Sequence, residues 1–193
     1  MFTSTQLDEF LERLPGGIIV VLDEAYFEYV VDSAYSHSLD YIRQKRPVLV
    51  LRTFSKVYGM AGMRVGYGLA DADLIHCLNQ VRSPFNTSSI AQVAAQAALD
   101  DHVHVRRSIE SNRIGYEFLT RELVSLGVKF VPSVTNFILV DTGRDCMQDF
   151  FRLMQEGVIV RPMRGNGFPT AFRLTIGTQQ ENERFIAAFK KFA

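Results

Sequence analysis

Two short apolar runs constrain the fold of this chain most, because each is rich in β-branched residues and each is followed at once by polar residues. Residues 17–22 read Gly-Ile-Ile-Val-Val-Leu and residues 47–51 read Pro-Val-Leu-Val-Leu. Runs of this length and composition predict strands, and the second reads as a buried parallel strand. Since open α/β sheets bind ligands at the carboxyl ends of their strands, the polar residues that follow are the first candidates for a functional site.

The second run leads into a lysine that lies between small hydroxyl residues and an arginine. Thr53 and Ser55 precede Lys56, and Arg64 follows eight residues later. The amine of a lysine can bond to an aldehyde, and a charge at the start of an apolar strand, as we expect for Arg64, favours an anionic partner. The pattern therefore indicates pyridoxal phosphate, a phosphorylated aldehyde cofactor. A lysine in isolation would most often be a solvated surface residue, but two nearby glycines favour a crowded site.

The first run ends in Asp23-Glu-Ala-Tyr26. An aspartate in this place is by itself more often a turn or cap residue. Together with the lysine, Asp23 could instead pair with the protonated ring nitrogen of the cofactor and keep the ring cationic, while Tyr26 could donate to the phenolic oxygen of the ring. Two strand ends would then serve one ring.

These residues resemble the signature of the fold-type I aminotransferases, with Asp23-x-x-Tyr26, Thr53-Phe-Ser-Lys56 and Arg64-x-Gly-Tyr67 in the same order and spacing. Later segments at residues 82–86, 160–162 and 166–178 are similar to those of the histidinol-phosphate aminotransferases within that family. The resemblance covers nearly the whole chain. Its motifs are specific in combination, although a Ser-Lys dipeptide alone would be weak.

The resemblance implies a role for each motif residue. Lys56 is the catalytic lysine, which holds the cofactor covalently and moves the substrate proton. Asp23 and Tyr26 bind the cofactor ring. The cofactor phosphate is bound by Thr53, Ser55 and Arg64, whose guanidinium offers a planar fork of donors. The substrate anion is bound by Arg161 and Arg173, which without the resemblance would be read as structural ion-pair formers.

The implied fold is α/β, the pyridoxal-phosphate-dependent transferase fold of aspartate aminotransferase, present as part of the large domain and a small carboxyl-terminal α/β domain. The implied reaction is the transamination of histidinol phosphate and 2-oxoglutarate, yielding glutamate, in histidine biosynthesis, and the implied oligomer is a homodimer. Three alternatives stay open. They are an aminotransferase of aromatic or other amino acids, a sister decarboxylase of a phosphorylated amino acid, and a folded remnant without activity.

Periodicity and capping residues predict alternating helices and strands. We expect helices at 6–14, 71–81, 90–99, 103–126, 145–156 and from residue 179, and further strands at 64–69, 137–141, 158–160 and 172–176. Asp71 and Ser88 are the expected amino-terminal caps of two of these helices. We expect residues 1–126 to belong to the large domain, including the long interdomain helix, and residues 127–193 to form the small domain.

The resemblance begins part-way along the family's sequence. In the family, an Asn-Pro-x-Gly turn, a glycine-rich phosphate-binding turn and an aromatic residue that stacks on the cofactor precede the segment that matches the start of this chain. None of them occurs in the matching place here, so roughly the first half of the usual enzyme is missing. We therefore expect the 193 residues alone to bind the cofactor poorly and to be inactive or poorly active.

Composition excludes several other classes of function. Twenty-one basic and 21 acidic residues give zero formal charge, so no bulk attraction to nucleic acid follows. The sequence has neither an apolar run of membrane-spanning length nor a signal peptide, and its two cysteines suit a reducing compartment, which favours a cytoplasmic location. The four histidines, at positions 37, 76, 102 and 104, lack the spacing of metal ligands, so no metal is expected.

Overall fold

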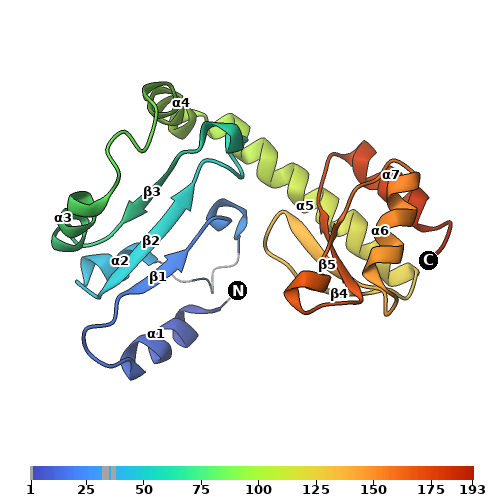
Figure 1. Cartoon of the computed structure of the whole chain (residues 1–193), viewed down its shortest axis with the longest axis horizontal. Helices are drawn as coiled ribbons and strands as arrows, with labels where there is room; N and C mark the ends of the chain where they lie inside the picture. The colour runs from blue at the N-terminus through green and yellow to red at the C-terminus, as the bar shows by residue number, and fades with distance from the viewer. Residues whose placement is uncertain (1, 32–34, 36–37) are drawn as a thin grey trace. The chain divides into compact units, whose positions relative to one another are not determined.

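The chain forms two compact units, which divide between Val105 and Arg106 (Figure 1). The computed structural model describes residues 2–31, 35 and 38–193, so His37 lies outside the described residues. Helix α5 (His102–Ser125) begins in the first unit and continues into the second. The predicted domain change lies at the other end of this helix, at residue 127. The compact units divide earlier because Leu119 and Leu123 of α5 are buried in the core of the second unit, and the assignment of residues 1–126 and 127–193 to large and small domains stays a prediction.

The first unit contains a three-stranded sheet in the order β1-β2-β3 (Figure 1). β1 (Val20–Asp23) pairs in parallel with β2 (Val48–Thr53), which confirms the parallel strands that the two apolar runs predict. β3 (Gly66–Leu69) pairs antiparallel to β2 and places Gly66 opposite Thr53. The carboxyl ends of β1 and β2 therefore meet at one edge of the sheet.

Helices α1 (Ser4–Arg13) and α2 (Ser38–Arg43) contribute to the core on one face of this sheet. This core consists of Leu7, Leu11, Leu22, Tyr41, Val48 and Val50. On the opposite face, Val21 and Leu51 are 54% and 37% exposed. Because side chains alternate along a strand, β2 is buried on one face only, which corrects the expectation of a fully buried strand.

Local capping chemistry fixes the helices that follow the sheet. Asp71 caps α3 (Ala72–Val81) and Ser88 caps α4 (Ser89–Asp100), each through a side-chain oxygen that accepts a backbone N–H, as the sequence predicts. Two short 3₁₀ helices, η1 (Phe27–Tyr29) and η2 (Ala61–Met63), follow the ends of β1 and β2.

The second unit contains a four-stranded antiparallel sheet in the order β4-β5-β7-β6. Its strands are β4 (Lys129–Val131), β5 (Phe137–Asp141), β6 (Arg161–Pro162) and β7 (Ala171–Thr175). The 3₁₀ helix η3 (Arg164–Asn166) lies between β6 and β7. Helices α6 (Cys146–Gln155) and α7 (Gln179–Phe189) pack on the sheet, and the rings of Phe172, Phe185 and Phe189 meet in the core.

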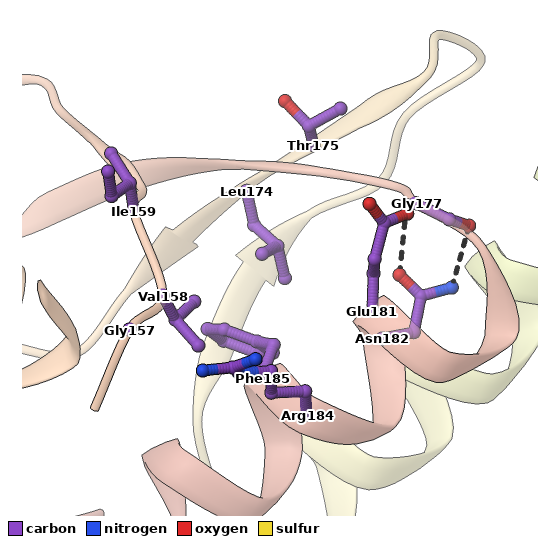
Figure 2. A pocket seen from close by; sticks show the side chains of 10 residues that line it. All are labelled: Gly157, Val158, Ile159, Leu174, Thr175, Gly177, Glu181, Asn182, Arg184 and Phe185. Atoms are coloured by element: carbon purple, nitrogen blue, oxygen red, sulfur yellow. Dashed lines mark hydrogen bonds between the residues drawn. The ribbon is translucent and has the colours of Figure 1, made fainter.

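Residues 158–160 do not form the strand that their apolar sequence predicts. β6 pairs with β7 only through Arg161 and Pro162, and Ile159 before them is 79% exposed. A cavity of about 280 Å³ opens between this segment, the end of β7 and α7 (Figure 2). The apolar pattern here reflects a connecting segment whose Val160 is buried in the core, rather than a strand paired in the sheet.

Candidate active site

Asp23 and Thr53 occupy the ends of neighbouring parallel strands, as the sequence predicts. Asp23 is the last residue of β1, and Thr53 is the last residue of β2. The carboxylate of Asp23 is exposed, and its Oδ1 accepts the backbone N–H of Ala25 at 3.1 Å. The backbone N–H of Ser55 donates to Oγ1 of Thr53 at 3.1 Å. Both side chains thus shape the turns that leave the sheet.

The loop that carries Lys56 is anchored by buried apolar side chains. Phe54 and Val57, on either side of Lys56, are 3% and 2% exposed. A ring nitrogen of His104 lies 3.0 Å from the carbonyl oxygen of Val57. The Nζ atom of Lys56 lies 5.2 Å from the centroid of the Tyr26 ring. The structure therefore brings the predicted lysine and the predicted ring-binding tyrosine together, although they lie on different strand ends.

An open cavity of about 380 Å³ lies beside this loop, and the three predicted phosphate-binding residues line it: Thr53, Ser55 and Arg64. Gly66 also lines the cavity, and a Cβ atom at this position would lie 2.7 Å from the carbonyl oxygen of Arg52. Only glycine allows the backbone of β3 to approach β2 so closely here. Two hydroxyls and a guanidinium around one cavity are a donor set that suits a phosphate group.

Arg64 differs from its predicted position at the start of a strand. It lies two residues before β3, in the left-handed conformation with φ of 54° and ψ of 48°, and its Nη1 donates to the carbonyl of Ala61 at 2.9 Å. A non-glycine residue in this conformation costs about 1–3 kcal/mol, and such residues cluster at functional sites, although Lys45 and Phe85 adopt a similar φ elsewhere in the chain. The strain is consistent with selection of Arg64 for its side chain rather than for its backbone.

Burial near the strand ends disfavours the charged forms of Tyr58 and Glu28. Burial raises the pKa of Tyr58, and the charge of Glu28 adds to this effect. Burial also raises the pKa of Glu28 itself.

Arg161 and Arg173 lie in the second unit, directly opposite each other in the pairing of β6 with β7. Residues opposite each other in a sheet point to the same face, where two like charges are unfavourable unless an anion lies between them. The Nε atom of Arg173 is buried and has no hydrogen-bond partner within the described part of the chain. Its Cζ lies 5.0 Å from the centroid of the Phe137 ring. The predicted pair is therefore side by side, in an arrangement that suits an anionic ligand.

Two further charged residues, Glu24 and Arg52, lie at the same strand ends, and the sequence motifs assign them no function. Glu24 follows Asp23, and Arg52 precedes Thr53, and the two form an ion pair with side chains only 1% and 12% exposed. The available signal was an arginine inside an apolar strand, which is costly unless a partner is present.

Within the ranges that the structure describes, no cluster of three or more histidine, cysteine, aspartate or glutamate side chains could hold a metal ion. None of the helices in those ranges is both long and apolar enough to cross a bilayer.

Residues 1–189 match the family model for aminotransferase class I and II. The chain belongs to this family. Among its relatives in aminotransferase class I and II, the histidinol-phosphate aminotransferase of Moorella thermoacetica is 50% identical over 186 residues, which cover 96% of this chain and 48% of that protein. Histidinol-phosphate aminotransferase 1 of Nitrosococcus oceani is 46% identical over 95% of this chain and 50% of its own length.

A solved structure of the same kind also superimposes on this member of aminotransferase class I and II. The histidinol-phosphate aminotransferase of Sinorhizobium meliloti, crystallised with pyridoxal-5′-phosphate, gives a TM-score of 0.86 at 29% identity, covering 98% of this chain and 53% of that chain. The similarity confirms the predicted fold. The chain spans about half the length of the curated relatives it matches.

Proposed function

We propose that this chain carries the cofactor-attachment residues and the substrate-anion residues of a pyridoxal-phosphate-dependent aminotransferase. The observation that carries the proposal is the position of the Lys56 amine, 5.2 Å from the centre of the Tyr26 ring, in a loop whose Ser55 lines a cavity with Thr53 and Arg64. An amine that can bond to an aldehyde and a donor set that suits a phosphate are the two requirements of this cofactor.

Each residue of the first unit has a part in this proposal. The cofactor, when bound, supplies an electron sink for the carbanion that forms at the substrate carbon. Thr53, Ser55 and Arg64 bind its phosphate group. Lys56 holds its aldehyde carbon covalently and, once released by the substrate, moves the proton at the substrate carbon. Asp23 pairs with the ring nitrogen, and Tyr26 donates to the ring oxygen.

The substrate proposal concerns Arg161 and Arg173. Their shared face and the unpaired, buried Nε of Arg173 support an anion site. The two relatives at 50% and 46% identity carry the name histidinol-phosphate aminotransferase. We therefore propose histidinol phosphate and 2-oxoglutarate as the substrates, with glutamate as the product of the second. We also propose a homodimer, which the resemblance supports. A cytoplasmic location is supported by the two cysteines, which are free.

The test is cofactor attachment followed by turnover. The chain is mixed with pyridoxal phosphate, alone and together with the separately produced amino-terminal half of the Moorella thermoacetica relative, and is then reduced with borohydride and mapped by mass spectrometry. We expect the label on Lys56, and glutamate formation from histidinol phosphate and 2-oxoglutarate in the combined sample. Label on Lys129 or Lys190 with Lys56 unmodified would contradict the assignment of Lys56 as the attachment lysine. Faster turnover of aromatic amino acids than of histidinol phosphate would show that the proposed substrate is wrong.

A further inference from the structure

Glu24 and Arg52 form a charged pair on the covered face of the three-stranded sheet. Each is the chain neighbour of a candidate site residue, since Glu24 follows Asp23 and Arg52 precedes Thr53. Because side chains alternate along a strand, Arg52 shares the buried face of β2 with Val50, whereas Thr53 points to the other face. Arg52 is also among the residues that line the cavity with Thr53, but its guanidinium pairs with Glu24 on the face opposite to the Thr53 side chain.

Both carboxylate oxygens of Glu24 have hydrogen-bond partners. Nε and Nη2 of Arg52 both lie 3.0 Å from Oε2 of Glu24, and the hydroxyl of Tyr35 donates to Oε1 at 3.0 Å. The Cζ atom of Arg52 lies 3.7 Å from the centroid of the Phe27 ring. Burial, reinforced by the charge of Glu24, raises the pKa of Tyr35, so its hydroxyl keeps the proton that it donates. The guanidinium and the carboxylate are thus held in one orientation.

The same pair closes the hydrogen-bond ladder between the two parallel strands. The backbone N–H of Glu24 donates to the carbonyl of Leu51 at 2.9 Å, one step beyond the last paired residue, Asp23. The side-chain contact of Glu24 with Arg52 follows immediately. Both strand ends are therefore joined by backbone and by side chains at the edge where the candidate site begins.

A contribution to folding stability does not by itself explain why Glu24 and Arg52 form a charged pair at this buried position. Burying two charges is costly, and apolar residues of similar volume often replace a buried ion pair without loss of stability. Apolar residues would not supply the directional contacts that fix one strand end against the other. We propose that Glu24 and Arg52 are positioning residues, which set the spacing between Asp23 and Lys56 by locking the ends of β1 and β2 together. This inference rests on the proposed function, because it assigns the pair to the cofactor-binding residues.

Three variants of the whole chain separate positioning from stability. Glu24→Gln and Arg52→Met each break the pair, and the double variant Glu24→Leu with Arg52→Met replaces it by apolar side chains. A matched control is Asp149→Asn in the second unit, where a fully buried carboxylate pairs with Nε of Arg144 at 3.2 Å. The thermal midpoint of each variant gives its stability.

The first measurement needs no cofactor. Amide hydrogen exchange is followed at the N–H of residue 24, which donates to Leu51, and at the N–H of Ala25, which donates to Asp23. We expect both amides to exchange about tenfold faster or more in the two single variants, and also in the apolar double variant when its midpoint equals that of the unaltered chain. Asp149→Asn should lower the midpoint and leave the two amides unchanged. Unchanged exchange in the double variant overturns the proposal.

The second measurement uses pyridoxal phosphate as the probe, with the amino-terminal half of the Moorella thermoacetica relative present throughout. We expect Lys56 of the apolar double variant to be labelled about 100-fold more slowly, because a misplacement of reacting groups by about 1 Å can cost this much in rate, and we expect the cofactor to bind more weakly. Equal binding and labelling in the double variant and in the unaltered chain also overturns the positioning role. If the unaltered chain gives no label on Lys56, the proposed function fails, while the exchange result still decides whether the pair locks the strand ends.

Discussion

At the scale of single residues, the electrostatic value of Asp23 depends on how much water surrounds it. Its side chain is exposed in this chain, and an exposed ion pair is worth about 0–1 kcal/mol. An enclosed charge that loses its partner costs about 3 kcal/mol, which is roughly a hundredfold in rate. The loss of rate on removing the charge of Asp23 therefore shows whether the assembled site encloses this carboxylate.

Asp23→Asn should lower turnover roughly a hundredfold in the assembled, cofactor-loaded enzyme and lower cofactor retention far less, because the amide keeps the size but not the charge. The measurements are kcat and the amount of cofactor retained after gel filtration. Asp71→Asn is the matched control, since Asp71 caps α3 and asparagine caps a helix equally well. Nearly unchanged turnover in Asp23→Asn would exclude the electron-sink role.

We propose that the arginine pair of the second unit, Arg161 and Arg173, binds the anionic group of the substrate. Replacing Arg161 or Arg173 with alanine should weaken the binding of histidinol phosphate more than the binding of an unphosphorylated amino acid, by about 2 kcal/mol for each charge-assisted contact. The measurement is kcat/KM for both substrates in the assembled enzyme. Arg184→Ala, which lines the separate cavity beside α7, is the control and should change neither value. Equal losses for both substrates would favour a general amino-acid aminotransferase.

At the scale of elements, the packing of α5 in the second unit depends on Gly115. A Cβ atom there would lie 2.6 Å from Cγ2 of Ile176 and 2.7 Å from Nδ2 of Asn182. Asn182 is held by hydrogen bonds of 2.9 and 3.0 Å to the backbone of Gly177, so it has little room to move. Close helix packing at this point therefore requires the absence of a side chain.

Gly115→Ala should lower the free energy of unfolding by about 1–2 kcal/mol, because overpacking outweighs the gain of up to about 1 kcal/mol that alanine gives in a helix. Denaturant unfolding followed by circular dichroism measures the change. Ser111→Ala on the exposed side of the same helix is the control and should be neutral or slightly stabilising. A stabilised Gly115→Ala variant would show that the helix can shift away from the α7 segment.

The elements that the sequence predicts well are those with local causes. Asp71 and Ser88 mark helix starts correctly because a capping side chain bonds to the backbone only two or three residues away. Strand β4, which the sequence does not predict, forms through its pairing with β5, and the segment at 158–160 does not pair. Short strands depend on such distant partners, which a single sequence does not reveal.

The candidate site divides in the same way. Asp23 and Thr53 stand at strand ends because apolar runs precede them, and this was predictable from the sequence. The ion pair of Glu24 with Arg52 depends on a contact between separate strand ends. Arg64 adopts its left-handed conformation at the end of η2, a short helix that the sequence does not predict. These features needed the structure.

At the scale of the whole chain, the most consequential feature is apolar surface in the first unit. Val21 and Leu51, on one face of the β1–β2 pair, are 54% and 37% exposed, and Ile19 beside them is 51% exposed. Further apolar side chains are open on and beside α4, where Phe85 is 99% exposed and Ile90 is 72% exposed. Exposed apolar surface, where such side chains gather, marks an interaction site or an aggregation hazard.

The 193 residues alone should therefore bind pyridoxal phosphate poorly and self-associate, even when they fold. Thr53, Ser55 and Arg64 offer side-chain donors to the cavity that we propose for the phosphate, whereas phosphate sites often also use backbone N–H groups at a helix amino terminus. The chain spans about half the length of its curated relatives. We propose that a segment like the amino-terminal half of those relatives would add backbone donors to the cavity and cover the sheet. Cofactor titration with light scattering on the same sample measures both properties, and adding the Moorella thermoacetica half should raise affinity while lowering scattering. A monomer that binds one equivalent of cofactor and turns over histidinol phosphate without that half would mean that the 193 residues suffice for the chemistry.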